Sequence, residues 1–169
     1  METMKAIKNR RSIRSYKNKE VPEEILTNLI KASMYAPSAG DEQPWEFIII
    51  DREDILQKIS QKQSNAQMVK QAPVAVLLCA DLSRVKHDDF WVQDCAAATQ
   101  NFLLAAHEMG LASCWVGIHP RKERVKDFNK MFELPDQIIP FALLPLGYAD
   151  ENPPQPDRFD ATRIRKNKW

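Results

Sequence analysis

The chain has 169 residues, 44% of them hydrophobic, and its 24 Lys and Arg side chains nearly balance 23 Asp and Glu. This size is enough for one hydrophobic core, and the near-neutral charge argues against a protein that coats nucleic acid. No apolar run is long enough to cross a bilayer and the N-terminus lacks a signal peptide, so we expect a cytoplasmic protein with one domain over residues 1–169 and no membrane partner.

Helical and extended patterns alternate along the first half without an internal repeat, which indicates one layered α/β structure. Pro22 followed by acidic residues begins a helix that must end before Pro37. The predicted elements are helices over residues 3–8 and 21–35, a strand over 47–51, helical segments over 53–61 and on to residue 70, and a buried strand over 73–80.

The second half continues with a helix over residues 90–109, which is apolar nearly all round and therefore lies within something large. A strand over 111–116, a charged surface helix over 120–130 and a strand over 138–146 follow. Residues 150–169 are rich in proline and predict an extended arm with the large side chains Phe159 and Trp169. The apolar helix and the arm together suggest that the arm lies on a partner subunit.

The segment from Asn9 to Tyr16 concentrates positive charge. Residues 5–19 contain seven Lys or Arg and no Asp or Glu. Arginine forks beside serine hydroxyls match the geometry of phosphate, so this segment predicts an anion site. A solvated basic surface remains the alternative.

Several common sites are missing from the sequence. Its four glycines cannot form a dinucleotide-binding fingerprint or a P-loop. Cys79, Cys95 and Cys114 are widely spaced in apolar surroundings, which is typical of reduced core thiols, and no metal site is expected.

A second candidate segment runs from Ala36 to Phe47. Small residues and Gly40 predict a tight loop whose backbone approaches a flat ligand, with Ser38, Asp41 and Gln43 free to bond the ligand's edge. The alternative is an ordinary connection between a helix and a strand, anchored by Trp45.

These two segments resemble those of the nitroreductase family of FMN-dependent oxidoreductases, in its compact form. The resemblance continues, in order, through Trp91–Ala98, Gly110–Gly117 and Leu146–Tyr148. It implies an α+β fold: a three-layer sandwich of a mixed, largely antiparallel sheet flanked by helices, in an intertwined homodimer. Two FMN molecules would lie at the interface, with residues from about 150 to 169 reaching over the partner.

The resemblance also assigns residues to the cofactor. It implies that the phosphate and ribityl chain are held by Arg10, Ser12 and Arg14, with Arg11 beside them and Arg158 closing the phosphate site. The isoalloxazine would be reached from the other subunit by Pro37, Ser38, Ala39 and Asp41, with Gln43 at its edge. The backbone of Val116 and Gly117 would face N5. No side chain is assigned as catalytic.

Asp41 departs from the family pattern, which more often has Asn there. An ionised carboxylate accepts hydrogen bonds but cannot donate them, and its charge disfavours an anionic reduced flavin. We therefore expect Asp41 to lower the flavin potential, unless it only caps the turn.

The implied activity is hydride transfer from NAD(P)H through FMN to a small flat acceptor such as a nitroaromatic compound or quinone. The protein would supply binding and orientation while the cofactor carries the reaction. The alternatives are family members with other flavin chemistry (dehalogenation, flavin fragmentation or dehydrogenation) and a flavin-binding sensor without turnover.

Overall fold

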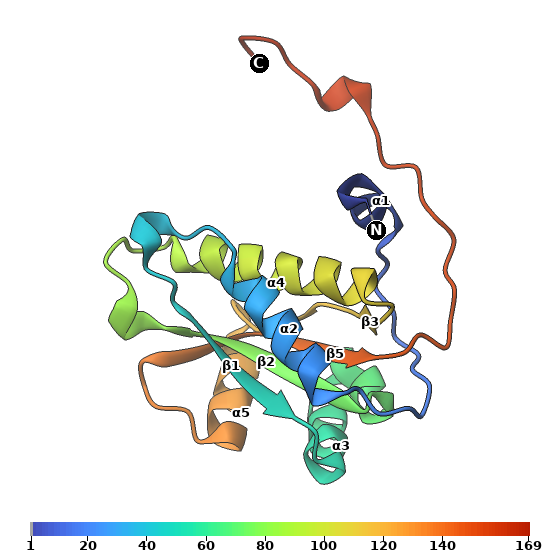
Figure 1. Cartoon of the computed structure of the whole chain (residues 1–169). Helices are drawn as coiled ribbons and strands as arrows, with labels where there is room; N and C mark the ends of the chain where they lie inside the picture. Colours follow the sequence, from blue (N-terminus) through green and yellow to red (C-terminus); the bar gives the residue numbers. More distant parts are fainter. Residues whose placement is uncertain (1) are drawn as a thin grey trace.

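The computed structural model describes residues 2–169, and within them an antiparallel sheet of five strands forms the centre (Figure 1). The strand order is β1-β2-β5-β3, and β4 also pairs with β5. The strands are β1 (Trp45–Ile50), β2 (Val74–Asp81), β3 (Ala112–Ser113), β4 (Val116–Gly117) and β5 (Ile138–Gly147).

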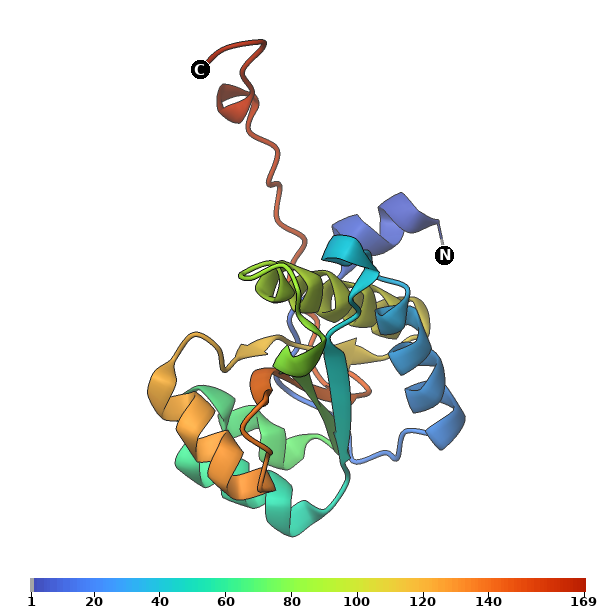
Figure 2. The ribbon, with the colours of Figure 1, turned by 90° about the vertical axis from the view of Figure 1, so that its left-hand side faces the viewer.

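Helices cover both faces of this sheet (Figure 2). One face carries α2 (Glu23–Met34) and α4 (Trp91–Glu108); the other carries α3 (Glu53–Lys62), η2 (Ser64–Gln71) and α5 (Lys122–Phe132). Successive β2 residues alternate between the faces, since Leu77 packs with the α3 and α5 core and Leu78 with the α4 core. Because both faces are covered, β2 reads as an unbroken apolar run, and the predicted three-layer α+β fold is confirmed.

The strand predicted over residues 111–116 is wrong in one respect, because it is divided into β3 and β4. The two pieces keep one register, with Ser113 opposite Leu146 and Val116 opposite Leu143. That register sets Cys114 opposite Pro145, which has no N–H to offer the ladder. Hydrogen bonding is therefore interrupted there without a change of direction.

The named strands pair antiparallel throughout. Between residues 2 and 169, the one parallel pairing is an isolated bridge from Ser12 to Ser113, which brings the basic N-terminal segment to the edge of the sheet. The predicted mixed character is thus limited to this bridge.

The two ends of the chain lie outside the layers (Figure 1). The predicted first helix is α1 (Thr3–Asn9), and the tail is extended apart from η4 (Ala161–Arg163). Phe159 is 78% exposed and Trp169 101% exposed, so no other segment of residues 2–169 covers them. The extended arm is confirmed as a shape; its contact with a partner stays a prediction. Among residues 2–169, no helix has the length and apolar character needed to span a bilayer.

Candidate functional site

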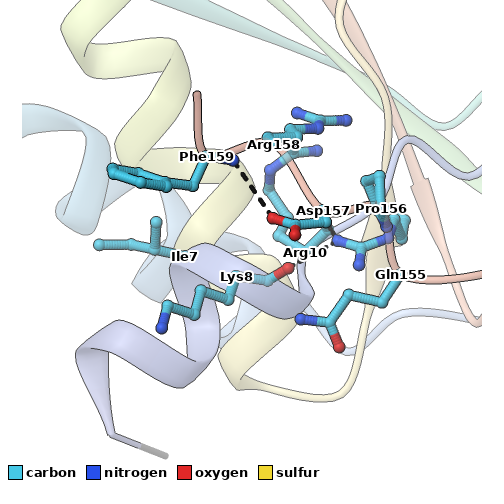
Figure 3. Close-up of a pocket in the computed structure, with 9 residues that line it drawn as sticks. Ile7, Lys8, Arg10, Gln155, Pro156, Asp157, Arg158 and Phe159 are labelled. Carbon is cyan, nitrogen blue, oxygen red and sulfur yellow. Dashed lines mark hydrogen bonds between the residues drawn. The ribbon is translucent and has the colours of Figure 1, made fainter. Parts of the chain in front are cut away.

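A pocket of about 640 Å³ lies between the end of α1 and the tail (Figure 3). Side chains from these two segments face one another across it, although almost 150 residues separate them in the sequence. The lining residues are Ile7, Lys8, Arg10, Arg11, Gln155, Pro156, Asp157, Arg158 and Phe159. The fold therefore brings together three residues predicted to bind the cofactor, Arg10, Arg11 and Arg158, and we call this hollow the arginine pocket.

Arg10 is half-buried, as is Arg11 beside it. The Nη1 atom of Arg10 is buried and has no hydrogen-bond partner among residues 2–169. Burial lowers the pKa of Arg10, and the positive charges of Arg158 and Arg11 lower it further. Like charges held together with unused donors fit an anion with several oxygens, such as a phosphate group, because it would supply both acceptors and charge.

Arg11 differs from Arg10 because two of its three guanidinium nitrogens already donate hydrogen bonds. Its Nη1 donates to the carbonyl oxygens of Lys8 (2.8 Å) and Arg10 (2.7 Å), and its Nε donates to Pro154 O (3.2 Å). Arg11 thus fastens the tail to the N-terminal segment. Glu151 adds a second fastening by accepting bonds from the backbone N–H groups of Arg14 and Ser15.

Ser12 and Arg14 lie outside the pocket, beside β3. Ile13 N donates to Ser113 O at 3.2 Å, which holds this segment along the sheet edge and leaves the Arg14 side chain exposed. Ser113 Oγ is buried close to Ser12 in the bridge and has no hydrogen-bond partner in the part of the chain that the structure describes. Ser113 is a candidate ligand that the sequence reasoning missed, since nothing in its local pattern marks it.

The loop after α2 contains η1 (Ala39–Asp41) and an unusual backbone. Gly40, Asp41 and Gln43 have positive φ angles of 56°, 56° and 48°. Ser38 Oγ accepts a bond from Gln43 N (3.1 Å), and Gln43 Nε2 donates to Asp41 Oδ1 (2.8 Å). The polar groups predicted to contact a ligand are therefore hydrogen-bonded to one another within the loop.

Two carboxylates anchor this loop to the rest of the fold. Asp94, in the first turn of α4 and only 5% exposed, accepts a bond from Ala39 N at 3.1 Å. Glu42 Oε1 accepts from the backbone N–H groups of Lys86 and His87, both at 2.9 Å, and lies 2.6 Å from His87 Nδ1. Burial raises the pKa of Asp94, and the Glu42 charge acts in the same direction. Neither Asp94 nor Glu42 was predicted to anchor the loop.

Val116 and Gly117, predicted to face N5, form β4. Val116 is buried, and Gly117 is half-buried with its carbonyl oxygen accepting a bond of 2.7 Å from Arg124 Nη1. Neither residue lines the arginine pocket.

The loop after α2 and the segment that follows α1 lie at opposite ends of α4 (Figure 1). Asp94 holds the loop near the start of the helix, whereas Arg10 and Arg11 lie near His107 in its last turn, where their charges add to burial in lowering the pKa of His107. The helical rise puts about 20 Å between Asp94 and His107. One chain therefore does not gather all the predicted cofactor residues.

The three cysteines offer no reactive thiol. All are buried and free, as predicted. Burial raises the pKa of each, to about 12 for Cys79, so the thiolate form is suppressed.

Comparison with known proteins identifies the family. The model of the nitroreductase family matches residues 7–148. A protein of Methanothermobacter thermautotrophicus named "Putative NADH dehydrogenase/NAD(P)H nitroreductase" is 47% identical, and the match covers 100% of this chain and 88% of the relative.

Solved structures agree with this match. A "Putative NADH Oxidase" of Clostridium acetobutylicum is 43% identical with a TM-score of 0.94, covering 97% of this chain and 99% of that one. An "FMN-dependent Nitroreductase" of Clostridium difficile is 30% identical with a TM-score of 0.91, covering 98% and 99%. Because sequence and structure match along nearly the whole length, the chain belongs to the nitroreductase family and is an oxidoreductase.

Proposed function

We propose that the protein is an FMN enzyme that takes hydride from NAD(P)H and reduces small flat acceptors such as nitroaromatic compounds or quinones. The observation that carries the proposal is the arginine pocket, where Arg10, Arg11 and Arg158 gather charge and Arg10 keeps a buried donor unused. A related structure named as FMN-dependent supports the choice of cofactor. FMN, when bound, supplies the chemistry: it accepts hydride and passes electrons to the acceptor.

The residues have distinct parts in this proposal. Arg10 and Arg158 hold the phosphate, and Arg11 keeps the tail in position so that Arg158 remains over the pocket. Ser12 and Arg14, at the edge of β3, take the ribityl chain. The backbone of Val116 and Gly117 borders the reactive edge, so their part is to orient the ligand rather than to move a proton.

The loop residues complete the site from a second copy of the chain. Pro37, Ser38, Ala39, Asp41 and Gln43 lie at the other end of α4 from the arginine cluster, so they serve the partner's cofactor. The exposed aromatic groups of the tail and the partly exposed apolar side of α4 favour such a homodimer. The arm from about residue 150 would then cross onto the partner.

The test is a visible absorption spectrum of the purified protein before and after anaerobic addition of NADPH or NADH, with the released ligand identified. We expect a yellow protein that yields FMN, bleaches on addition and recovers colour with a nitroaromatic acceptor. If the protein contains flavin but neither NADPH nor NADH reduces it, the alternative function of a non-catalytic flavin-binding sensor would be favoured. Protein that takes up no FMN would contradict the proposal.

A further inference from the structure

A second hollow, which we call the lysine groove, lies on the far side of the fold from the tail. It has a volume of about 730 Å³ and runs between Trp91 at the start of α4 and the outer side of α5. None of the residues predicted to bind FMN lines it.

The floor of the lysine groove is apolar and partly aromatic. Leu82, Val125 and Ile139 contribute aliphatic surface. Trp91 meets the ring of His119 edge to face, with 4.7 Å between the ring centroids. A rigid aromatic floor of this kind suits a flat apolar group. The group gains contact area there, and the two rings lose little conformational freedom when it binds.

One wall of the groove is cationic. Lys122, Lys126 and Lys130 stand at intervals of four residues along α5, so they project from one side of the helix and all line the groove. None of them makes an ion pair within the part of the chain that the structure describes, and no Asp or Glu of that part lines the groove. The groove thus combines an apolar floor with three unpaired positive charges.

We propose that the lysine groove binds an organic anion with a flat apolar body and a single carboxylate or sulfonate group. The apolar floor takes the body, and the lysine ammonium groups attract the charged end. An inorganic phosphate would use only the lysines and leave the floor uncovered. The protein's own tail does not fit, because Arg163, Arg165, Lys166 and Lys168 give its end the same sign as the groove.

The experiment uses the full chain saturated with FMN and two fluorescent probes of similar shape. 8-Anilinonaphthalene-1-sulfonate carries the anionic group, and N-phenyl-1-naphthylamine lacks it. Both are titrated into the wild type, into the triple variant Lys122→Gln, Lys126→Gln, Lys130→Gln, and into Lys58→Gln, a control at an exposed lysine of α3.

We expect the triple variant to weaken binding of the sulfonate about three- to a hundredfold, as three exposed charge pairs would, and to leave the neutral probe unchanged. Lys58→Gln should change neither, and added salt should weaken the sulfonate in the wild type but not in the triple variant. An unchanged sulfonate affinity in the triple variant, or no binding in the wild type because a second copy covers the groove, would overturn the proposal. Loss of FMN binding in the wild type would instead count against the proposed function.

Discussion

The arginine pocket of one chain and the loop at residues 37–43 of its partner are predicted to contact the same FMN molecule, yet the free protein prepares these two regions in opposite ways. In the pocket, Arg10 keeps a buried nitrogen that has no partner in the described part of the chain, and it lies among like charges. In the loop, the backbone of Ala39 is held by Asp94, and Glu42 ties the loop to residues 86–87. The pocket holds a hydrogen-bond donor and positive charges that await an anion, whereas the loop is already held in place by hydrogen bonds within the protein.

This difference indicates where binding free energy originates. Unpaired positive charges in the pocket lower the stability of the free protein. An anion that binds there removes this penalty, and the difference adds to its binding free energy. A loop that is already ordered loses little entropy on binding, so it contributes shape and position more than affinity. Mutations in the two regions should therefore separate affinity from stability.

The largest effect is expected for Arg10→Ala. One lost charge-assisted hydrogen bond of about 1.5–3 kcal/mol should weaken FMN about ten- to 150-fold, which a titration of flavin fluorescence measures. The free protein should melt no lower, because the variant relieves the crowding of positive charge that lowers the pKa of Arg10. Arg52→Ala, at an exposed surface pair with Asp54, is the control that should retain affinity. If Arg10→Ala instead melted much lower and kept its affinity for FMN, Arg10 would stabilise the fold rather than bind the cofactor.

Gly40→Ala should give the next largest effect. Gly40 has φ 56°, and a Cβ there would lie 2.9 Å from His87 Cε1. We expect the free energy of unfolding to fall by more than the roughly 1–2 kcal/mol that a left-handed backbone alone costs an L-residue. Gly110→Ala is the matched control, since Gly110 has φ 75° with nothing within 4 Å of a Cβ.

Urea unfolding of Gly40→Ala in the wild-type and His87→Ala backgrounds measures the share due to the contact. The penalty should fall towards that of Gly110→Ala when His87 is absent. Equal penalties in both backgrounds would show that His87 moves aside freely.

Asp94→Asn gives a smaller effect, seen through its pH dependence. Burial raises the pKa of Asp94 above its ordinary value of 3.8. The folded state therefore binds the proton more tightly than the unfolded state does. As pH rises from the unfolded-state pKa through the raised folded-state pKa, ionisation of Asp94 lowers the free energy of unfolding. Asn keeps the acceptor for Ala39 N without the charge, so the variant's melting temperature relative to the wild type should rise from pH 4 towards pH 7. A constant difference across that range would mean that the carboxylate is not strained by burial.

The smallest expected effect is a change in redox potential with Asp41→Asn. The side chain of Asp41 is exposed and bonded to Gln43, so its charge is partly screened from a bound flavin. Removing the charge should raise the flavin midpoint potential modestly, as followed by dye-linked reduction. An unchanged potential would mean that Asp41 serves only the turn.

Much of the layered core could be predicted from local pattern. The apolar run of β2, the periodicity of α2 and the long apolar stretch of α4 each reflect burial, which depends on side-chain chemistry along a short segment. The division between β3 and β4 was missed because its cause, Pro145 on β5, lies thirty residues away and acts only through the register.

The candidate site shows the same division. The sequence by itself determined the charge of the N-terminal segment and the tight backbone of the loop, because each depends on residues close together in the chain. It also determined the likeness to a family, because that likeness is the order of several short motifs along the chain. Only the tertiary structure decided that Arg11 fastens the tail beside the pocket, that Asp94 holds Ala39, and that α4 keeps the arginine pocket and the loop apart. These are contacts between distant segments, and their geometry follows from how the helices pack on the sheet rather than from any local pattern.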